Sequence, residues 1–234
     1  KGIDALNVIP AFFTFAIFPV ISRQALEDRA ALSATYQLAV KLMVVLALPA
    51  AMTMTLLARP FIGVLGGSAF LPDSAIALQI MVWSIPIGWI NSVTNYVLIA
   101  VDQQRFLTRA FIIGLAFNFV ANWRFIPFYD YRAAAVITIF SELVLLLAFY
   151  VGIHRHLAPV HWWTLLWRPG LAGVMMAAVG LALWPVSTLL ALVVSLAVYA
   201  VSVFFLRAFT TDEIALISGR RRNDVRAQPG LPEV

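Results

Sequence analysis

The feature that most constrains this chain is a series of long apolar runs separated by short clusters of charge, proline and glycine. Hydrophobic residues make up 62% of the chain and charged residues only 12%, and that balance excludes an ordinary soluble domain. A helix needs about 20 apolar residues to cross the hydrocarbon core of a bilayer. The pattern therefore predicts an all-α fold, a polytopic bundle of membrane-spanning helices.

Seven runs have the length of a membrane span. They cover residues 3–22, 37–58, 74–101, 108–126, 133–153, 169–185 and 188–206. The glycine-rich segment 59–73 is expected to be a loop or a broken helix. Since the chain enters its first span almost at once, we expect it to be the C-terminal part of a longer protein.

Three regions follow from these spans. We expect five transmembrane helices in residues 1–158, an interfacial segment with two further transmembrane helices in 159–207, and a polar tail in 208–234. Trp162, Trp163 and Trp167 fit the headgroup level of a membrane, where the segment around them can lie flat.

Lysine and arginine predict how the spans are oriented. Twelve of the sixteen basic residues fall on one side of the seven spans and four on the other. The positive-inside rule therefore puts the loops near 23–36, 102–109 and 154–168 in the cytoplasm, together with the C-terminus. The net charge of +5 is read as a sign of topology, and no nucleic-acid partner is expected.

Glu142 lies in the middle of the fifth span. A charge at the bilayer centre costs about 2.5–3.5 kcal/mol, so such a residue usually faces a bundle interior or a wet cavity. Two interpretations remain open: a group on a transport path that binds H⁺ or Na⁺, or a hydrogen-bonded carboxyl group that joins two helices. The adjacent Ser141 points to another face and is expected to add little.

Small and polar residues form stripes on three of the spans. The stripes, at helical spacing, are Ser84, Gly88, Asn91 and Asn95 on the third span, Gly114, Asn118 and Asn122 on the fourth, and Asn7, Pro10 and Thr14 on the first. Together they predict a shared polar interior of the kind found in transporters, with Pro86 allowing a kink. Any single asparagine can equally serve a hydrogen bond between helices.

The sixth span has a different stripe. Gly170, Gly173, Ala177 and Gly180 leave only small side chains on one face, which predicts close helix packing and no chemistry. The last two spans are therefore expected to be peripheral additions to the bundle.

Two cations near the ends of spans are candidates for contact with an anionic substrate. Lys41 lies at the cytoplasmic end of the second span and Arg124 at the outer end of the fourth, and either could meet a phosphate. The alternative is that both simply anchor their helices at the membrane surface.

Features of catalysis and metal binding are missing from the sequence. The chain has no cysteine, no glycine-rich phosphate loop and no nucleophile elbow. His154 and His156 lie two residues apart without a nearby carboxylate, a poor metal site. We therefore expect neither an enzyme, nor a metal, nor a cofactor.

Several segments resemble one known family. They are "FFTFAIFPVISRQ", "RPFIGVLGGSAFLPDSAIALQIMVWSIPIGWINSVTNYVLIAVDQQR", "YDYRAAAVITIFSELVLLLAFY" and the closing "AFTTDEIALISG". In this order they resemble the C-terminal half of the polysaccharide-biosynthesis flippases, which belong to the multidrug/oligosaccharidyl-lipid/polysaccharide exporter superfamily. The resemblance covers nearly the whole chain.

The resemblance implies a transporter of two six-helix lobes that enclose a cavity and open alternately to the two sides. This chain would supply the second lobe, less its first helix, with two extra C-terminal helices. Such proteins move an undecaprenyl-pyrophosphate-linked oligosaccharide across the bacterial cytoplasmic (inner) membrane, and no bond is made or broken. Glu142 matches the acidic position of the family's "S-E" helix, and Asn91 and Asn95 lie on the long helix that precedes it in the family's order. The cations that hold the pyrophosphate would lie in the missing N-terminal lobe.

Three alternatives remain at this stage. A multidrug or toxic-compound extruder of the same superfamily would use more acidic groups in its cavity than Glu142 alone. A membrane glycosyltransferase, polymerase or ligase would need a sizeable outer loop with catalytic acids or arginines. A purely structural membrane subunit would show packing stripes and few amides.

Overall fold

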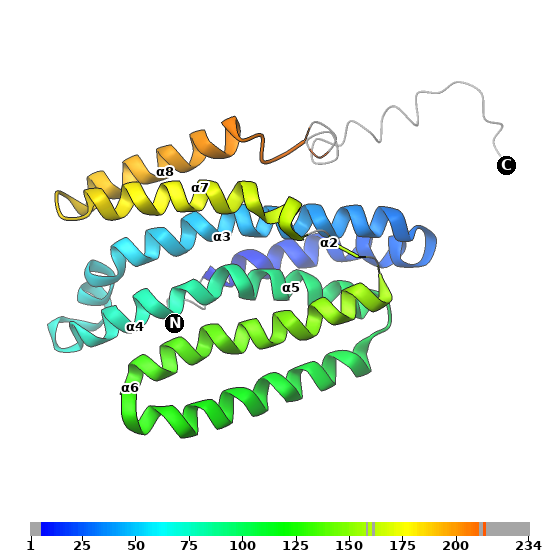
Figure 1. Ribbon diagram of the computed structural model, residues 1–234, viewed down its shortest axis with the longest axis horizontal. Coiled ribbons are helices and arrows are strands. Elements are labelled where there is room, and N and C mark those ends of the chain that lie inside the picture. The colour runs from blue at the N-terminus through cyan, green and yellow to red at the C-terminus, as the bar shows by residue number, and fades with distance from the viewer. Residues whose placement is uncertain (1–5, 158, 161, 211–212, 214–234) are drawn as a thin grey trace.

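The computed structural model describes residues 6–157, 159–160, 162–210 and 213, and all regular structure in these residues is helical. The predicted all-α fold is thereby confirmed (Figure 1). The elements are α2 (Val8–Glu27), α3 (Arg29–Gly66), the short 3₁₀ helix η1 (Ser68–Phe70), α4 (Asp73–Met81), η2 (Val82–Ser84), α5 (Ile85–Ala100), α6 (Gln104–His156), α7 (Trp162–Leu183) and α8 (Thr188–Phe205).

Local sequence explains where α3 begins and ends. Asp28 has an extended backbone between α2 and α3, and its carboxylate accepts hydrogen bonds from the amides of Ala30 and Ala31 at 2.9 and 3.0 Å. This is an N-cap, which satisfies amides that the first turn of a helix leaves unpaired. At the other end Gly67 has φ +79°, a conformation that favours glycine.

Six helical segments in the described residues are long and apolar enough to cross a membrane. One of them is the continuous run of α4, η2 and α5, Asp73–Ala100. Another, α6, has 53 residues and consists of two helices joined at Asp130, whose φ of 48° and ψ of −138° are not helical. The chain doubles back at this point (Figure 1). The first arm, 104–129, and the second arm, 131–156, contain the fourth and fifth predicted spans, so the described helices account for all seven.

Two helices extend beyond the spans predicted for them. α3 continues through Pro60 to Gly66, so the loop expected over 59–73 shortens to the residues around η1. Ala58 packs with Ala75 and Leu78 of α4 in a small buried cluster, which stabilises α3 at this end. In addition, α7 begins at Trp162, so the interfacial tryptophans belong to the same helix as the sixth predicted span.

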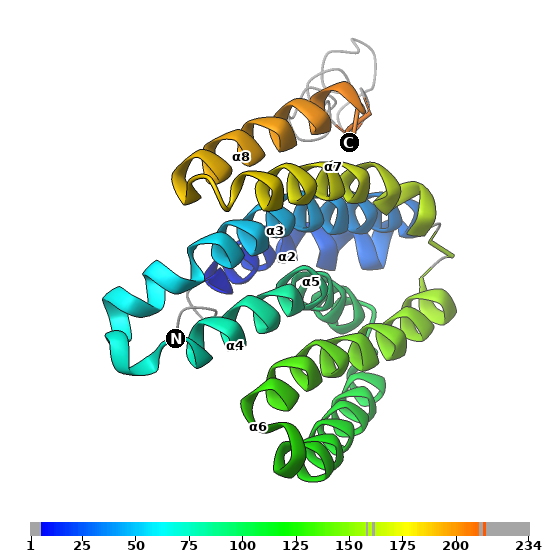
Figure 2. The same ribbon diagram turned by 60° about the vertical axis from the view of Figure 1, so that its left-hand side comes forward.

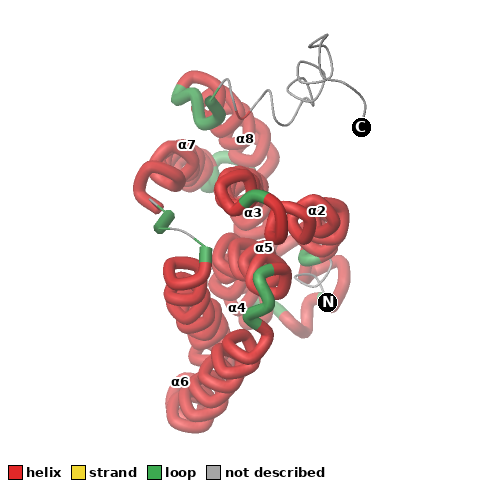
Figure 3. The backbone as a smooth tube through the Cα atoms, turned by 90° about the vertical axis from the view of Figure 1, so that its right-hand side faces the viewer, coloured by secondary structure: helices red, strands yellow, loops and turns green. Residues whose placement is uncertain are grey.

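Helices α2, α3 and α5 form the centre of the molecule. The hairpin of α6 lies on one side of this group and the pair α7–α8 on the opposite side (Figures 2 and 3). The connections α2–α3, α5–α6 and α6–α7 gather at one end of the bundle, and α8 runs toward that end (Figure 1). These are the loops that the basic residues predict to be cytoplasmic. Successive spans therefore alternate in direction, as that prediction requires.

The largest buried side chains come from α3, α5 and α6 and belong to one core. Tyr36 of α3, Trp89 of α5 and Phe149 of α6 are at most 1% exposed, and the Tyr36 hydroxyl lies 3.0 Å from Oγ1 of Thr94. By contrast, the outer surfaces carry many exposed aromatic and aliphatic side chains, such as Phe12, Phe119 and Phe204. In a membrane protein such surfaces face lipid.

One glycine permits the arms of α6 to approach each other. A Cβ on Gly152 in the second arm would lie 2.6 Å from Cε1 of Phe106 in the first, whereas a Cβ on Gly170 in α7 would have no neighbour within 4 Å. Gly152→Ala is therefore expected to lower the stability of the protein in detergent by about 1–3 kcal/mol, the usual cost of overpacking. Thermal unfolding measures this, and Gly170→Ala is the control, expected to be neutral or slightly stabilising. Equal stability of the two variants would contradict the packing described.

Candidate functional site

Glu142 points into the bundle and is held by α5. The side-chain amide of Asn91 donates to Oε2 of Glu142 at 2.8 Å and to its backbone carbonyl at 2.9 Å. One turn earlier on α5, a Cβ on Gly88 would lie 3.5 Å from the carboxylate. Asn91 and Gly88 thus share the helix face predicted from their spacing, and the missing side chain of Gly88 leaves room for the carboxylate beside α5.

The carboxylate borders a cavity of about 260 Å³ between α2, α5 with the preceding η2, and the second arm of α6. Its lining residues are Asn7, Pro10, Ala11, Ser84, Ile85, Gly88, Ser92, Tyr96 and Glu142. Five of these bring polar side chains, and the volume is ample for several water molecules. The predicted stripes of the first and third spans therefore meet at a shared polar interior.

Asn91 leaves one polar atom without a partner. Its Oδ1 is buried and receives no hydrogen bond within the described part of the chain. Glu142 is similar, because its second oxygen, Oε1, receives none there either, while Oε2 is bound by Asn91. The pair thus retains acceptor capacity, and of the two residues Glu142 lines the cavity. A free acceptor suits a proton or a cation better than an anion.

Asn118 and Asn122 form a separate polar group. Asn118 in the first arm of α6 donates to Oγ of Ser141 in the second arm at 2.9 Å, and Asn122 donates to Oδ1 of Asn118 at 3.1 Å. Both asparagines line a groove along the first arm, beside Phe119 and Trp123. They hold the two arms together and do not border the cavity of Glu142.

Ser141 therefore contributes more than the sequence indicated. It differs in direction from Glu142 by about 100° around the helix, and each residue meets a different neighbour: Ser141 the first arm of α6, Glu142 helix α5. The only signal in the sequence was that Asn118 lies in the span just before it.

The remaining polar candidates of the sequence lie elsewhere. Asn95 is half-buried, is not among the residues that line the cavity, and makes no side-chain hydrogen bond within the described residues. Tyr96 takes its place at that end of the cavity. Arg124 is exposed near the turn at Asp130, with its guanidinium 4.9 Å from the ring centre of Phe128. A role for Asn95 or Arg124 in transport stays a prediction.

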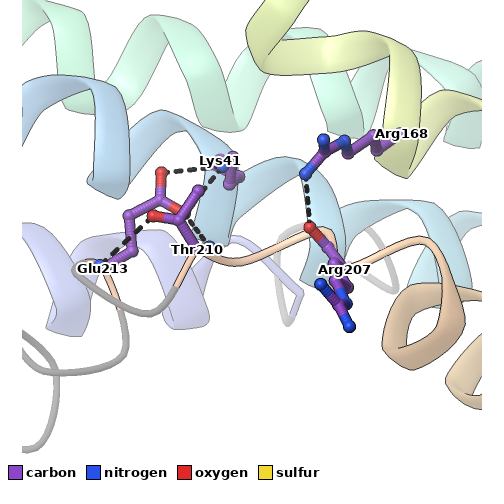
Figure 4. Close-up of polar contacts among 5 residues, drawn as sticks. All are labelled: Lys41, Arg168, Arg207, Thr210 and Glu213. Atoms are coloured by element: carbon purple, nitrogen blue, oxygen red, sulfur yellow. Dashed lines mark hydrogen bonds and ion pairs between the residues drawn. The ribbon is translucent and has the colours of Figure 1, made fainter.

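Lys41 is buried in an ion pair on the other side of the bundle (Figure 4). Its ammonium group donates to both carboxylate oxygens of Glu213 at 2.7 and 2.8 Å, and its side chain is only 8% exposed. Burial alone would raise the pKa of Glu213, but hydrogen bonds from Lys41 and Thr210 outweigh it and hold that pKa below its usual value. In this structure Lys41 thus meets an anion supplied by the chain itself.

The ion pair of Lys41 with Glu213 predicts how the stability of the folded protein depends on pH. Because the pKa of Glu213 is lowered in the folded chain, its contribution to stability is complete at neutral pH and is lost as the pH falls below the usual value of 4.5 toward the folded pKa. Thermal unfolding of the wild type and of Glu213→Gln in detergent between pH 7 and pH 3 measures this. The wild type is expected to be the more stable at pH 7, with the difference shrinking below pH 4.5. A difference that persists unchanged at pH 3 would contradict the assignment.

The two histidines at the end of α6 have ordinary contacts. The ring of His154 stacks on Tyr150, and Nδ1 of His156 lies 2.9 Å from the carbonyl of Gly152. Within the described residues, no three histidine, aspartate or glutamate side chains come together as metal ligands would.

Helices of membrane length, lipid-type outer surfaces and a polar interior define a multi-pass membrane protein. A family model described as MatE matches residues 6–124, about half of the chain. The chain belongs to this family of membrane transporters, within the multidrug/oligosaccharidyl-lipid/polysaccharide superfamily. The match does not distinguish the polysaccharide-biosynthesis flippases from the multidrug extruders.

A solved structure shows the same fold. The chain is similar to "Lipid II flippase MurJ, inward closed conformation", with a TM-score of 0.70 and 16% sequence identity. The similarity covers 88% of this chain and 46% of that one, so the chain spans about half the length of that protein. Among curated proteins, none matches this chain significantly.

Proposed function

We propose that this chain is the second lobe of a transporter that moves a lipid-linked oligosaccharide across the bacterial cytoplasmic membrane by alternating access. The observation that carries the proposal is the polar cavity beside Glu142 and Asn91, enclosed by helices whose outer surfaces suit lipid. The MatE family match and the MurJ-like fold support it. MurJ is, by its name, a flippase of lipid II.

In the proposed mechanism, the sugars and pyrophosphate of an undecaprenyl-linked glycan pass through the space between two lobes while the polyprenyl tail stays in lipid. The first lobe, in the remaining half of the protein, supplies the cations that bind the pyrophosphate. Cavities of this kind let polar groups cross the bilayer without exposure to hydrocarbon. No bond in the substrate is made or broken, so the protein is not an enzyme.

Glu142 has the role of a coupling group in this proposal. Asn91 neutralises none of its charge, since an amide is an uncharged donor, and Oε1 accepts no hydrogen bond within the described residues. A proton or Na⁺ entering the cavity would therefore find an available carboxylate oxygen. Binding there would change the charge between α5 and α6 and bias the closure of the lobes.

The location proposed is the inner membrane, with the C-terminus in the cytoplasm. The support is the excess of basic residues on one side of the spans and the gathering of the corresponding loops at one end of the bundle (Figure 1).

The test replaces Glu142 by Gln in the complete protein and follows surface polysaccharide in the native bacterium. Glutamine keeps the size of the side chain and can still accept from Asn91, but it cannot bind a proton or cation as a carboxylate does. Export is expected to fall about ten-fold or more at a normal protein level, the loss of a coupling interaction of about 1.4 kcal/mol or greater. Unchanged export would remove Glu142 from the mechanism.

Two controls sharpen this experiment. Glu27→Gln makes the same chemical change at the exposed end of α2, where the carboxylate lies 3.7 Å from the guanidinium of Arg23. This variant is expected to leave export unchanged. Susceptibility to cationic drugs is measured in the same strains. If Glu142→Gln changes drug susceptibility and not polysaccharide, the protein is a multidrug extruder and the flippase proposal is wrong.

A further inference from the structure

The chain turns back toward the bundle directly after α8. The amide of Ala208 donates to the carbonyl of Val203 at 3.1 Å and that of Arg207 to the carbonyl of Phe204 at 3.0 Å. With Arg207 at φ +47°, these are the two bonds of a Schellman motif, which ends a helix and reverses the chain. Ala208 is completely buried, so the residues after α8 are packed against the bundle.

Two cations from different helices hold this returning segment (Figure 4). Arg168 of α7 donates to the backbone carbonyl of Arg207 at 2.6 Å. Lys41 of α3 binds the carboxylate of Glu213 and lies 5.7 Å from the ring centre of Phe209. The segment is thereby tied to both α7 and α3.

The ion pair of Lys41 with Glu213, which joins the returning segment to α3, is stable only while both charges are present. The side chains of Lys41 and Glu213 are 8% and 20% exposed. Removing one member of a buried ion pair leaves an uncompensated charge, which is strongly destabilising, whereas replacing both by apolar residues is often neutral. If the carboxylate of Glu213 is lost, the ammonium of Lys41 therefore has to move toward water, and the returning segment loses its attachment.

Apart from this segment, the hairpin of α7 and α8 contacts α3 through a buried apolar cluster that includes Met52 of α3, Met176 of α7 and Tyr199 of α8. Close contacts at two glycines and, among the described residues, one hydrogen bond add to it. Gly173 and Gly180 of α7 face Leu48 and Met52 of α3 closely, and the hydroxyl of Tyr199 in α8 donates to the carbonyl of Val45 at 2.8 Å. The hairpin lies at the edge of the bundle (Figure 3), and its outer side chains are exposed. Between helices in lipid, no hydrophobic effect drives such contacts together.

We propose that Leu206–Thr210 together with Glu213 form a clasp that fixes the α7–α8 hairpin on α3, and that breaking the pair of Lys41 and Glu213 lets the hairpin move away. In the open state, the face of α3 with Leu48 and Met52 meets lipid, and the second lobe has a lateral opening toward the bilayer. This clasp does not depend on which substrate is carried.

The test measures the distance between α3 and α8 by double electron–electron resonance. The chain has no cysteine, so spin labels can be placed at Ala34→Cys and Val201→Cys, both exposed and outside the clasp. The complete protein is used, in lipid nanodiscs and with cysteines in its other half replaced. The wild type is expected to give one narrow distance distribution. Glu213→Gln is expected to broaden it and shift it to longer distances.

Two further variants decide the outcome. Glu27→Gln, which breaks the exposed pair with Arg23, should leave the distribution narrow. The double variant Lys41→Met with Glu213→Met, which removes both buried charges, should return it close to that of the wild type. An unchanged distribution in Glu213→Gln would overturn the clasp. If Glu213→Gln does not accumulate, a recovered yield in the double variant supports the clasp, and an equally low yield overturns it.

Discussion

The hydrogen bonds between Asn91 and Glu142 are the interaction on which the rest of this structure depends. A carboxylate placed in the middle of a membrane helix needs a partner inside the bundle, because lipid offers it none. Asn91 meets that need through two bonds, one to the carboxylate and one to the backbone of the same residue. The second arm of α6 is thereby fixed to α5 with its polar side toward the cavity and its apolar sides toward lipid.

This polar contact differs in kind from those around it. The pairs of Asn118 with Ser141 and of Tyr36 with Thr94 join two helices and leave no acceptor toward the cavity. The pair of Lys41 with Glu213 neutralises a buried charge at the periphery. Only the site of Glu142 combines a carboxylate, a buried amide oxygen without a donor in the described residues, and a polar cavity. For this reason, the proposed coupling role is given to Glu142 and not to the other polar groups.

Much of the fold and part of the site could be predicted from the sequence. Helix length and hydropathy are local properties, so the spans and the all-α fold followed from runs of apolar residues. The inward direction of Glu142 followed from its insertion cost, and the shared face of Gly88 and Asn91 from helical spacing. The contacts that the sequence did not predict are made between residues far apart in the chain. Glu213 pairs with Lys41 across 172 positions, and no local pattern indicates that partner.

Boundaries and neighbours were harder to predict for the same reason. The glycines of 59–73 suggested a loop or a broken helix, but α3 stays helical to Gly66, where Ala58 packs against α4. Ser141 and Glu142 are adjacent in sequence, yet the hairpin of α6 gives them different partners. Asn95 has the correct spacing for the stripe of α5, but Tyr96 borders the cavity at that level.

The central claim is that the face of α5 beside Glu142 lines a space open to water within the membrane. Since the chain has no cysteine, a single cysteine at Ser92 can be tested in membranes with a charged, membrane-impermeant methanethiosulfonate reagent. The matched position is Leu147 on the second arm of α6, whose side chain is 66% exposed on the lipid side. We predict rapid modification of Ser92→Cys and little or none of Leu147→Cys. Modification of Leu147→Cys with Ser92→Cys protected would contradict the claim.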